Sequence, residues 1–143
     1  MKVSIKPLRP DIPLPQHHTV GSVAFDLAPC DDAIIGPGEI KWLPTGLVIC
    51  TPPGYMLMIA PRSSTAMKWG LQNPSSVGVI DQDFCGAKDE IKLCVRNFTD
   101  KPVTITKGTR LSQGIFVKID KAEWEELEKL DAPSRGGWGS TGH

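Results

Sequence analysis

The 143-residue sequence has no excess of charge of either sign, no long apolar run and no paired cysteine motif. Lys plus Arg and Asp plus Glu both number 16, so the chain lacks the basic excess typical of a nucleic-acid binder. No apolar stretch approaches the roughly 20 residues that cross a bilayer, and the amino terminus lacks the apolar core of a secretory signal. We therefore expect a soluble intracellular protein with one folded domain, cytoplasmic or, in a eukaryote, also nuclear, that binds neither nucleic acid nor membrane.

Clustered metal ligands are also missing. The four cysteines are Cys30, Cys50, Cys85 and Cys94, and none forms a C-x-x-C pair. A zinc site requires thiolates or imidazoles at short spacing, and the histidines are the adjacent His17 and His18 and the last residue. We expect no metal held directly by protein side chains, and we expect reduced, mostly buried thiols.

Short segments with the pattern of strands recur along the chain. Glycine and proline, 14 and 13 residues, are frequent and scattered, which argues against long helices. Apolar or alternating runs between them predict strands at residues 23–28, 40–43, 47–51, 55–60, 77–80, 91–97, 103–106 and 115–119. Many short strands at this spacing indicate an all-β sandwich or barrel.

The carboxyl-terminal part of the chain has a different composition. Residues 121–130 place Trp124, Leu127 and Leu130 on one helical face, although Glu and Lys dominate, so either a short helical turn or an irregular acidic connector is expected. Residues 132–143 are polar and rich in glycine, with no apolar pattern to offset the entropy of ordering them. We therefore divide the chain into a β domain, residues 1–131, and a mobile arm, residues 132–143.

Two polar segments directly follow predicted strands. Arg62, Ser63 and Ser64 bring a guanidinium and two hydroxyls to a strand exit, where they could clamp an oxyanion or form a solvated turn. Residues 78–84 end an apolar run in two carboxylates, of which Asp81 comes first. A carboxylate at the end of a rigid strand could accept a proton from an attacking water, or it could cap its own turn.

Two later segments also combine polar groups that could bind an anion. Arg110 and Gln113, at the start of a late strand, could contact phosphate or belong to a plain edge strand. Residues 135–142 contain four glycines with Arg135, Trp138, Ser140 and Thr141, so their backbone N–H groups could wrap a polyphosphate. The G-x-x-x-x-G-K-[ST] pattern of P-loops is absent, and a disordered tail is the alternative, although such a tail has little use for a tryptophan.

Together with residues 22–27 (SVAFDL), these segments resemble the five ordered motifs of the trimeric dUTP diphosphatase (dUTPase) family across almost the whole chain. The resemblance implies a jelly-roll-type β-sandwich or distorted barrel, and a homotrimer whose active sites draw residues from neighbouring chains. The implied reaction is hydrolysis of dUTP to dUMP and pyrophosphate, which keeps dUTP out of DNA and supplies dUMP for thymidylate synthesis. The implied cofactor is Mg²⁺ held mainly through the substrate triphosphate.

The resemblance assigns the chemistry to four of the motifs. Asp81 would deprotonate a water that attacks the α-phosphorus, and Asp26 would lie near waters of the magnesium ion. Arg62, Ser63 and Ser64 would bind the substrate through its phosphates, with the help of Gln113.

The remaining motif residues would recognise the nucleoside and close the site. The backbone at Val79 and Ile80, together with Lys92, would read uracil, and Phe84 would stack on the deoxyribose. The arm, through Arg135, Gly137, Trp138, Ser140 and Thr141, would close over the site, with the tryptophan against the base and the arginine near the γ-phosphate.

Some positions depart from the family pattern. Phe84 replaces the usual tyrosine, which keeps a steric wall against a 2′-hydroxyl, and Ser75 stands where many members have an asparagine that touches uracil. Ser64 occupies a common glycine position. Arg135 directly precedes the Gly-Gly pair, and Pro133 occupies the usual place of the arginine.

Two alternatives remain open. A dCTP deaminase, alone or bifunctional with dUTPase activity, would have the same fold, but Met67 and Cys94 stand where its second arginine and its catalytic glutamate fall. A non-catalytic regulatory member of the fold would have lost the base or the arm, whereas Asp81 and the Gly-Ser-Thr-Gly sequence are both present.

Overall fold

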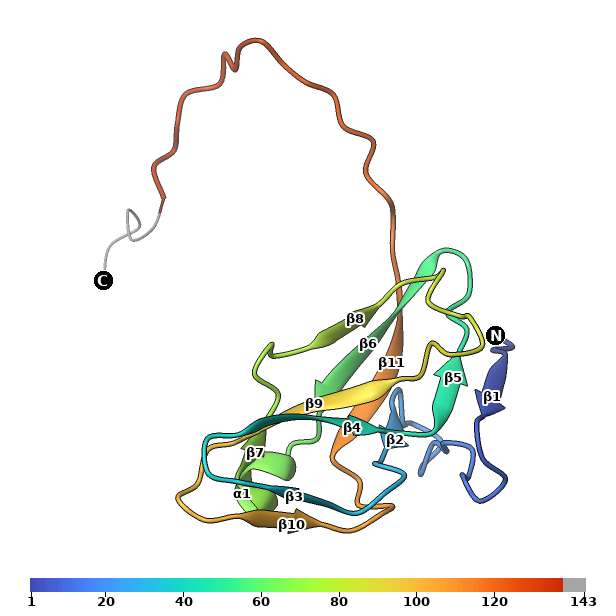
Figure 1. The fold of residues 1–143 in the computed structure, drawn as a ribbon. Coiled ribbons are helices and arrows are strands. Elements are labelled where there is room, and N and C mark those ends of the chain that lie inside the picture. The colour runs from blue at the N-terminus through green and yellow to red at the C-terminus, as the bar shows by residue number, and fades with distance from the viewer. Residues whose placement is uncertain (138–143) are drawn as a thin grey trace.

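Short β-strands dominate the computed structural model, which describes residues 1–137 (Figure 1). In chain order the elements are β1 (Ile5–Pro7), β2 (Phe25–Leu27), β3 (Ala33–Ile35), β4 (Ile40–Pro44), β5 (Leu47–Ile49), β6 (Tyr55–Pro61), α1 (Thr65–Trp69), β7 (Leu71–Gln72), β8 (Gly78–Ile80), β9 (Lys92–Asn97), β10 (Val103–Ile105) and β11 (Ser112–Lys118). Within this part of the chain, no helix has the length and apolar character needed to span a membrane. The expectation of an all-β fold is confirmed.

Each predicted strand segment overlaps an observed strand, with ends that differ by at most three residues. The sequence analysis does not predict β1, β3 or β7, which have two or three residues each. It also misses α1, whose five residues are too few for a helical period.

The strand pairs in residues 1–137 are antiparallel and form four sheets. The largest sheet has the order β2-β11-β6-β8, a three-stranded sheet has the order β4-β9-β7, and β1 pairs with β5 and β3 with β10. Neighbours in the sheets are rarely consecutive in sequence, so connections carry the chain from one sheet to another, as in a jelly-roll-type sandwich. Figure 1 shows β8, β6 and β11 side by side in the largest sheet.

The hydrophobic core lies between these sheets. Leu57 and Ile59 of β6 and Leu93 and Val95 of β9 are all buried and belong to one apolar cluster. Full burial of such a side chain stabilises the fold by about 1.5–3 kcal/mol. Side chains from both sheets therefore fix the frame that carries the polar strand ends.

Close packing between β2 and β11 sets the position of Asp26. Gly114 lies opposite Phe25 in the strand register, and a Cβ at Gly114 would stand 2.4 Å from the Phe25 ring. Phe25 and Leu27 are buried at 6% and 1% exposure. Because side chains alternate across a strand, the intervening Asp26 points to the opposite face.

A buried asparagine joins three segments at the other end of the core. The Asn97 amide nitrogen donates to the carbonyl oxygens of Ile35 at 3.0 Å and Lys101 at 2.7 Å. Its side-chain oxygen accepts from both the backbone N–H and the hydroxyl of Thr99, each at 2.8 Å. Asn97 has no solvent exposure, so its polar atoms are satisfied entirely within the protein.

We expect Asn97→Ala to destabilise the fold by about 2–4 kcal/mol, because buried carbonyl and N–H groups lose their partners and water cannot replace them. Urea unfolding followed by circular dichroism measures the change. The exposed neighbour Asp100 provides the control, and Asp100→Ala should change stability by less than about 0.5 kcal/mol. Equal unfolding midpoints for the two variants would contradict the role of the asparagine.

The cysteines are paired differently from the prediction. Cys50 and Cys85 form a disulfide with 5.0 Å between their Cα atoms, while Cys30 and Cys94 are free. The expectation of reduced thiols is therefore wrong for the first two. Because 35 residues separate them, only the folded chain shows that the end of β5 lies beside the loop that follows β8.

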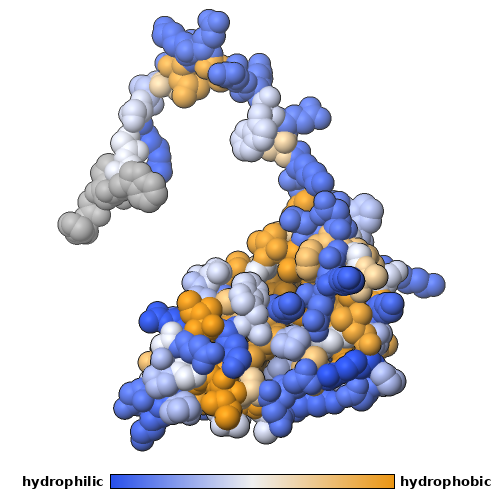
Figure 2. Space-filling view, in the orientation of Figure 1, coloured by the Kyte–Doolittle hydropathy of each residue, from blue (hydrophilic) through white to orange (hydrophobic). Residues whose placement is uncertain are grey.

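Beyond β11 the chain leaves the sheets and extends away from them (Figure 1). Residues 120–137 are exposed and contain neither helix nor strand, so residues 121–130 form the irregular connector and not the helical turn. Trp124 and Leu130 are 94% and 77% exposed. Figure 2 shows this extension clear of the folded part, with hydrophobic residues among hydrophilic ones.

Candidate functional site

The polar residues at positions 62–64 and 110–113 meet where β6 ends and β11 begins. In the register, Ser112 pairs with Pro61 on one side and with Leu27 on the other. This pairing brings Arg62, just after β6, and Arg110, just before β11, beside Asp26 in the middle of β2. Three short segments that are distant in sequence thus converge at one end of the largest sheet.

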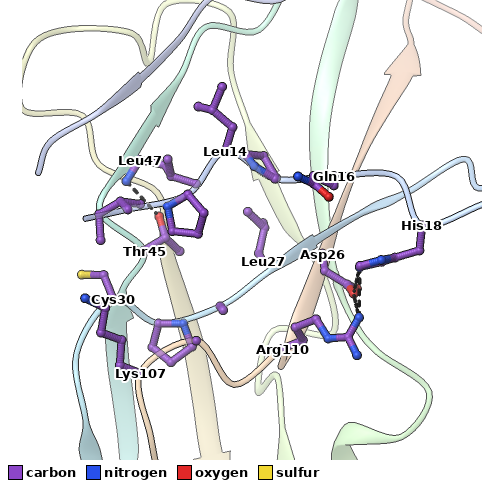
Figure 3. Close-up of a pocket in the computed structure, with 16 residues that line it drawn as sticks. Leu14, Gln16, His18, Asp26, Leu27, Cys30, Thr45, Leu47, Lys107 and Arg110 are labelled. Atoms are coloured by element: carbon purple, nitrogen blue, oxygen red, sulfur yellow. Dashed lines mark hydrogen bonds and ion pairs between the residues drawn. The ribbon is translucent and has the colours of Figure 1, made fainter. Parts of the chain in front are cut away.

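A carboxylate lies at the centre of this cluster. Asp26 Oδ1 pairs with Arg62 Nε at 2.9 Å, and Asp26 Oδ2 lies 3.0 Å from Arg110 Nη1 and 3.0 Å from His18 Nε2. The Asp26 side chain is 14% exposed, whereas those of Arg62 and Arg110 are 29% and 49% exposed. Figure 3 shows Asp26, His18 and Arg110 converging at one end of a half-open groove, whose other walls include Leu27 and Leu47.

The charge balance of the cluster favours an anion. Two guanidinium groups share one carboxylate, which leaves one net positive charge on these three side chains. Guanidinium groups donate several hydrogen bonds in a fixed plane, and the more exposed edges of Arg62 and Arg110 face solvent. The arrangement can bind phosphate oxygens while Asp26 holds both arginines in place.

Hydrogen bonds also fix the turn that carries the two serines. The Arg62 N–H and the Thr65 hydroxyl both donate to Leu111 O, at 3.2 Å and 2.6 Å, and the Thr65 N–H donates to Arg62 O at 3.0 Å. Ser63 is exposed between these anchors, and Ser64 precedes α1 without a side-chain capping hydrogen bond. A fixed turn therefore presents the Ser63 hydroxyl to solvent next to the arginines.

Gln113 lies just inside the same end of the sheet. It pairs in register with Asp26 and Ala60, and its amide nitrogen donates to Pro61 O at 3.3 Å. This contact stabilises the strand exit from which Arg62 projects.

Asp81 lies at the opposite end of the sheet. It directly follows β8, is exposed, and has neither a side-chain hydrogen bond nor an ion pair among residues 1–137. A hollow beside it is lined by residues from the start of β6, from the end of β11 and from its own loop, namely Tyr55, Met56, Asp81, Gln82, Asp83, Ile119 and Lys121. The Gln82 amide nitrogen donates to Tyr55 O at 3.0 Å, which holds this turn against β6.

The two polar ends are far apart within one chain. Leu57 of β6 pairs with Ile80 of β8, so the next residue after β8, Asp81, lies beside Met56. Met56 is six residues before Arg62 in the chain. At a rise of about 3.3 Å per residue, the two ends of β6 are separated by about 20 Å. One chain therefore does not bring Asp81 into contact with the Arg62 cluster.

The residues expected to recognise the nucleoside lie on the Asp81 side. Val79 is 56% exposed on β8, Ile80 packs against the core, and Phe84 is 38% exposed in the following loop. Lys92 is exposed where β9 begins, opposite Pro44. Within residues 1–137 β8 pairs only with β6, so alternate backbone groups of β8 point away from the sheet and can bind a ligand.

The arm residues are only partly described. Arg135 and Gly137 are exposed in the extension and lie outside both polar ends. Trp138, Ser140 and Thr141 lie outside the described residues. The roles that the sequence analysis predicts for the arm residues therefore remain predictions.

Sequence reasoning missed the contact between His18 and Asp26. A partly buried carboxylate between two apolar residues of a strand needs cationic partners, and this rule points to the arginines of the other motifs. His18 lies in an irregular segment before β2, so no periodicity or motif marks it.

The described residues do not form a metal cage. Across residues 1–137, no three side chains of His, Cys, Asp or Glu are grouped so as to hold an ion. Among these described residues, Asp26 alone offers carboxylate oxygens beside the arginines. A cation at this end of the sheet would therefore need most of its ligands from a bound phosphate and from water.

The fold and the charge pattern together define an all-β protein with an anion-binding cluster at one end of its largest sheet. The dUTPase family model matches residues 10–142, and the chain belongs to that family. The deoxyuridine 5'-triphosphate nucleotidohydrolase of Hydrogenobaculum sp. is 41% identical over 145 residues, which covers 99% of each chain. That of Corynebacterium glutamicum is 38% identical over 143 residues, 98% of this chain and 94% of the relative.

Solved structures agree with this assignment. The dUTPase from Streptococcus mutans superposes with a TM-score of 0.77 at 30% identity, covering 84% of this chain and 98% of that one. A dUTPase of Staphylococcus bacteriophage 80alpha with dUPNHPP superposes with a TM-score of 0.86 over 99% of this chain and 98% of that one. At 20% identity the phage protein shows the fold alone, and the predicted jelly-roll-type fold is confirmed.

Proposed function

We propose that this chain hydrolyses dUTP to dUMP and pyrophosphate, with Asp81 as the general base. The observation that carries the proposal is an exposed carboxylate at the end of β8, beside a hollow, in a chain of the dUTPase family. A base placed on a rigid strand end can hold a water in line for attack on the α-phosphorus. The proton of that water passes to Asp81 as the bond to the leaving pyrophosphate breaks.

The active site is proposed to form between chains of a homotrimer. About 20 Å separates the two ends of β6, so a phosphate held by Arg62 in one chain cannot reach Asp81 of the same chain. A neighbouring copy can supply the missing end, and cyclic assembly repeats that contact at every interface. The exposed Trp124 and Leu130 also support an assembly, because a neighbouring chain would cover them.

Arg62, Ser63 and Ser64 bind the triphosphate in this proposal. The two arginines of the cluster neutralise charge on the phosphate oxygens, and the Ser63 hydroxyl donates a further hydrogen bond. Gln113 supports the same strand exit through its contact with Pro61.

Nucleoside recognition takes place at the Asp81 end of the sheet in this proposal. The free backbone groups of β8 at Val79 and Ile80 pair with the edge of uracil, and Lys92 contributes from the start of β9. Phe84 packs against deoxyribose and leaves no room for a 2′-hydroxyl.

Magnesium fits the acidic residue present at the phosphate end. Asp26 would accept hydrogen bonds from ion-bound water, and an ion that prefers oxygen ligands and keeps several waters suits a site with one carboxylate. When bound, Mg²⁺ neutralises charge on the triphosphate and stabilises the leaving pyrophosphate. Asp26 meanwhile keeps Arg62 and Arg110 oriented toward the phosphates.

The carboxyl-terminal arm completes the site from a further chain. Arg135 would approach the γ-phosphate, and Gly137, Trp138, Ser140 and Thr141 would cover the nucleotide, with Trp138 against the base. Exclusion of bulk water strengthens the electrostatic contacts in the site. The connector and the start of the arm support this role, because residues 120–137 extend away from the sheets. We also propose that the enzyme works in the cytoplasm.

The test is a nucleotide panel. Full-length protein is incubated with dUTP, UTP, dCTP or dTTP and Mg²⁺, and products are separated by ion-exchange chromatography. We expect dUMP and pyrophosphate from dUTP alone, and loss of turnover in excess EDTA. Ammonia released from dCTP would favour a deaminase instead, and no product from any nucleotide would favour a regulatory protein.

A further inference from the structure

The loop between β8 and β9, residues 81–91, carries both the proposed base and the proposed sugar wall. At its start, the Gln82 amide nitrogen donates to Tyr55 O at 3.0 Å. Near its end, the Glu90 carboxylate accepts the Gly46 N–H at 2.7 Å. Both ends of the loop are thus hydrogen-bonded to the β framework.

The middle of the loop is attached differently. The Cys85 N–H donates to Asp83 O at 2.9 Å, and the Gly86 N–H donates to the Asp89 carboxylate at 2.6 Å, so these bonds stay inside the loop. Over residues 1–137, no hydrogen bond or ion pair joins residues 83–89 to the chain outside the loop. The Cys50–Cys85 disulfide makes that connection.

The framework end of the disulfide is itself fixed. Cys50 follows β5, and its N–H donates to Ser4 O at 2.9 Å, which continues the pairing of β1 with β5. The loop end, Cys85, is next to Phe84, which is 38% exposed. The covalent bond therefore ties the residue beside the aromatic ring to a strand pair in the framework.

We infer that the Cys50–Cys85 disulfide positions Phe84 as the wall that separates deoxyribose from ribose. With the disulfide closed, Phe84 is fixed and UTP is excluded. With the disulfide reduced, the wall shifts and the enzyme distinguishes dUTP from UTP less well. The inference rests on the proposed function. Asp81 keeps its place in both states, because β8 and the Gln82 contact hold it independently.

A dithiol reductant is the co-reactant that opens the bond. Its thiolate attacks one sulfur to form a mixed disulfide, and its second thiol resolves that intermediate. Two electrons and two protons pass to Cys50 and Cys85, which become thiols, and the reductant leaves as a disulfide. Both cysteines are partly exposed, so a small reductant has access. Disulfides inside cells are often transient and redox-sensing.

The other two cysteines have low reactivity in thiol–disulfide exchange. Burial raises the pKa of the Cys30 and Cys94 thiols above the ordinary value, so little of either is thiolate at neutral pH. Cys94 is only partly buried and lies on β9, opposite Trp42 and outside the loop, which makes it a suitable control position.

The experiment compares four full-length proteins: the original chain without reductant, the same chain with dithiothreitol, the double variant Cys50→Ser/Cys85→Ser, and Cys94→Ser. Steady-state kinetics with dUTP and UTP give kcat and KM for each. We expect reduction and the double variant to lower the dUTP/UTP ratio of kcat/KM about tenfold. The lower ratio should result from changes in KM, while kcat for dUTP should change by less than about twofold. Without reductant, Cys94→Ser should have the dUTP/UTP ratio of the original chain. On reduction, its ratio should fall as it does in the original chain.

Two measurements separate this inference from the proposed reaction. Thiol titration in denaturant should find two free thiols before reduction and four after it, since Cys30 and Cys94 are already free. Hydrogen exchange in residues 83–89 should accelerate on reduction. If both occur but dUTP is not hydrolysed, the loop attachment stands and the proposed reaction fails. Four free thiols from the outset, or an unchanged dUTP/UTP ratio with an equal loss of kcat for both nucleotides, would overturn the inference.

Discussion

Asp81→Asn is expected to lower kcat for dUTP by about 10²–10⁴-fold, because an amide cannot accept the proton of the attacking water. Affinity for a non-hydrolysable dUTP analogue should stay within about threefold, since Asn keeps the shape of the side chain and loses only the charge. Pyrophosphate release measures the first quantity and isothermal titration calorimetry the second. The melting temperature should not change, because the Asp81 side chain is exposed and has no polar partner among residues 1–137.

A neighbouring carboxylate supplies the control for this prediction. Asp83 lies in the same loop and is also exposed, and Asp83→Asn should keep kcat within about threefold. If Asp81→Asn turned over dUTP at a rate similar to that of Asp83→Asn, the base would have to be another group.

Mixed assemblies test whether the base comes from another chain. Asp81→Asn alone and Arg62→Ala alone should both be inactive. Co-expression should restore activity, because an Arg62→Ala chain still donates Asp81 and an Asp81→Asn chain still donates the arginine cluster. Restoration requires the two ends of β6 to work in different chains, as their separation of about 20 Å indicates. Co-expressed chains that stay as inactive as the separate ones would contradict shared sites.

Deletion of residues 134–143 is expected to reduce dUTP turnover by about 100-fold or more, because the site would stay open to water and lack the contacts proposed between the arm and the nucleotide. The fold should be unaffected: residues 134–137 are exposed, and the one hydrogen bond described there, from the Gly136 N–H to the Ser134 hydroxyl at 3.2 Å, is internal to the arm. Phosphate release gives the turnover, and thermal unfolding and light scattering report stability and oligomeric state.

Removal of His143 alone is the matched control for the arm. This deletion keeps the Gly-Ser-Thr-Gly sequence and should retain full turnover. If the longer deletion were equally active, residues 134–143 would be a tail without a catalytic role. If it disrupted the trimer, the arm would serve assembly instead.

Much of the fold could be predicted from the sequence because its signals are local. Alternation in β9 and the apolar runs of β6 and β11 are visible in the sequence alone. The pairing order is not visible, because β11 lies between β2 and β6 through contacts that span most of the chain. The same limit applies to the disulfide, whose cysteines belong to separate segments.

For the site, the motifs indicate which residues bear chemistry but not how they are arranged. Arg62 and Asp81 both follow strands in the sequence, and nothing there indicates that they lie at opposite ends of one sheet. Nor does the sequence reveal that Asp26 holds two arginines and contacts His18. Such contacts depend on the antiparallel register, which a single sequence does not specify.

The length of β6 has a genetic consequence if the chains assemble as proposed. Each chain then serves different catalytic centres, giving its carboxylate to one, its arginine pair to another and its arm to a third. A chain that has lost only Asp81 disables one centre of a mixed trimer, whereas a chain that has lost both ends disables two. Single lesions in different copies of the gene could therefore compensate for each other, while a double lesion in one copy would act dominantly over a normal copy.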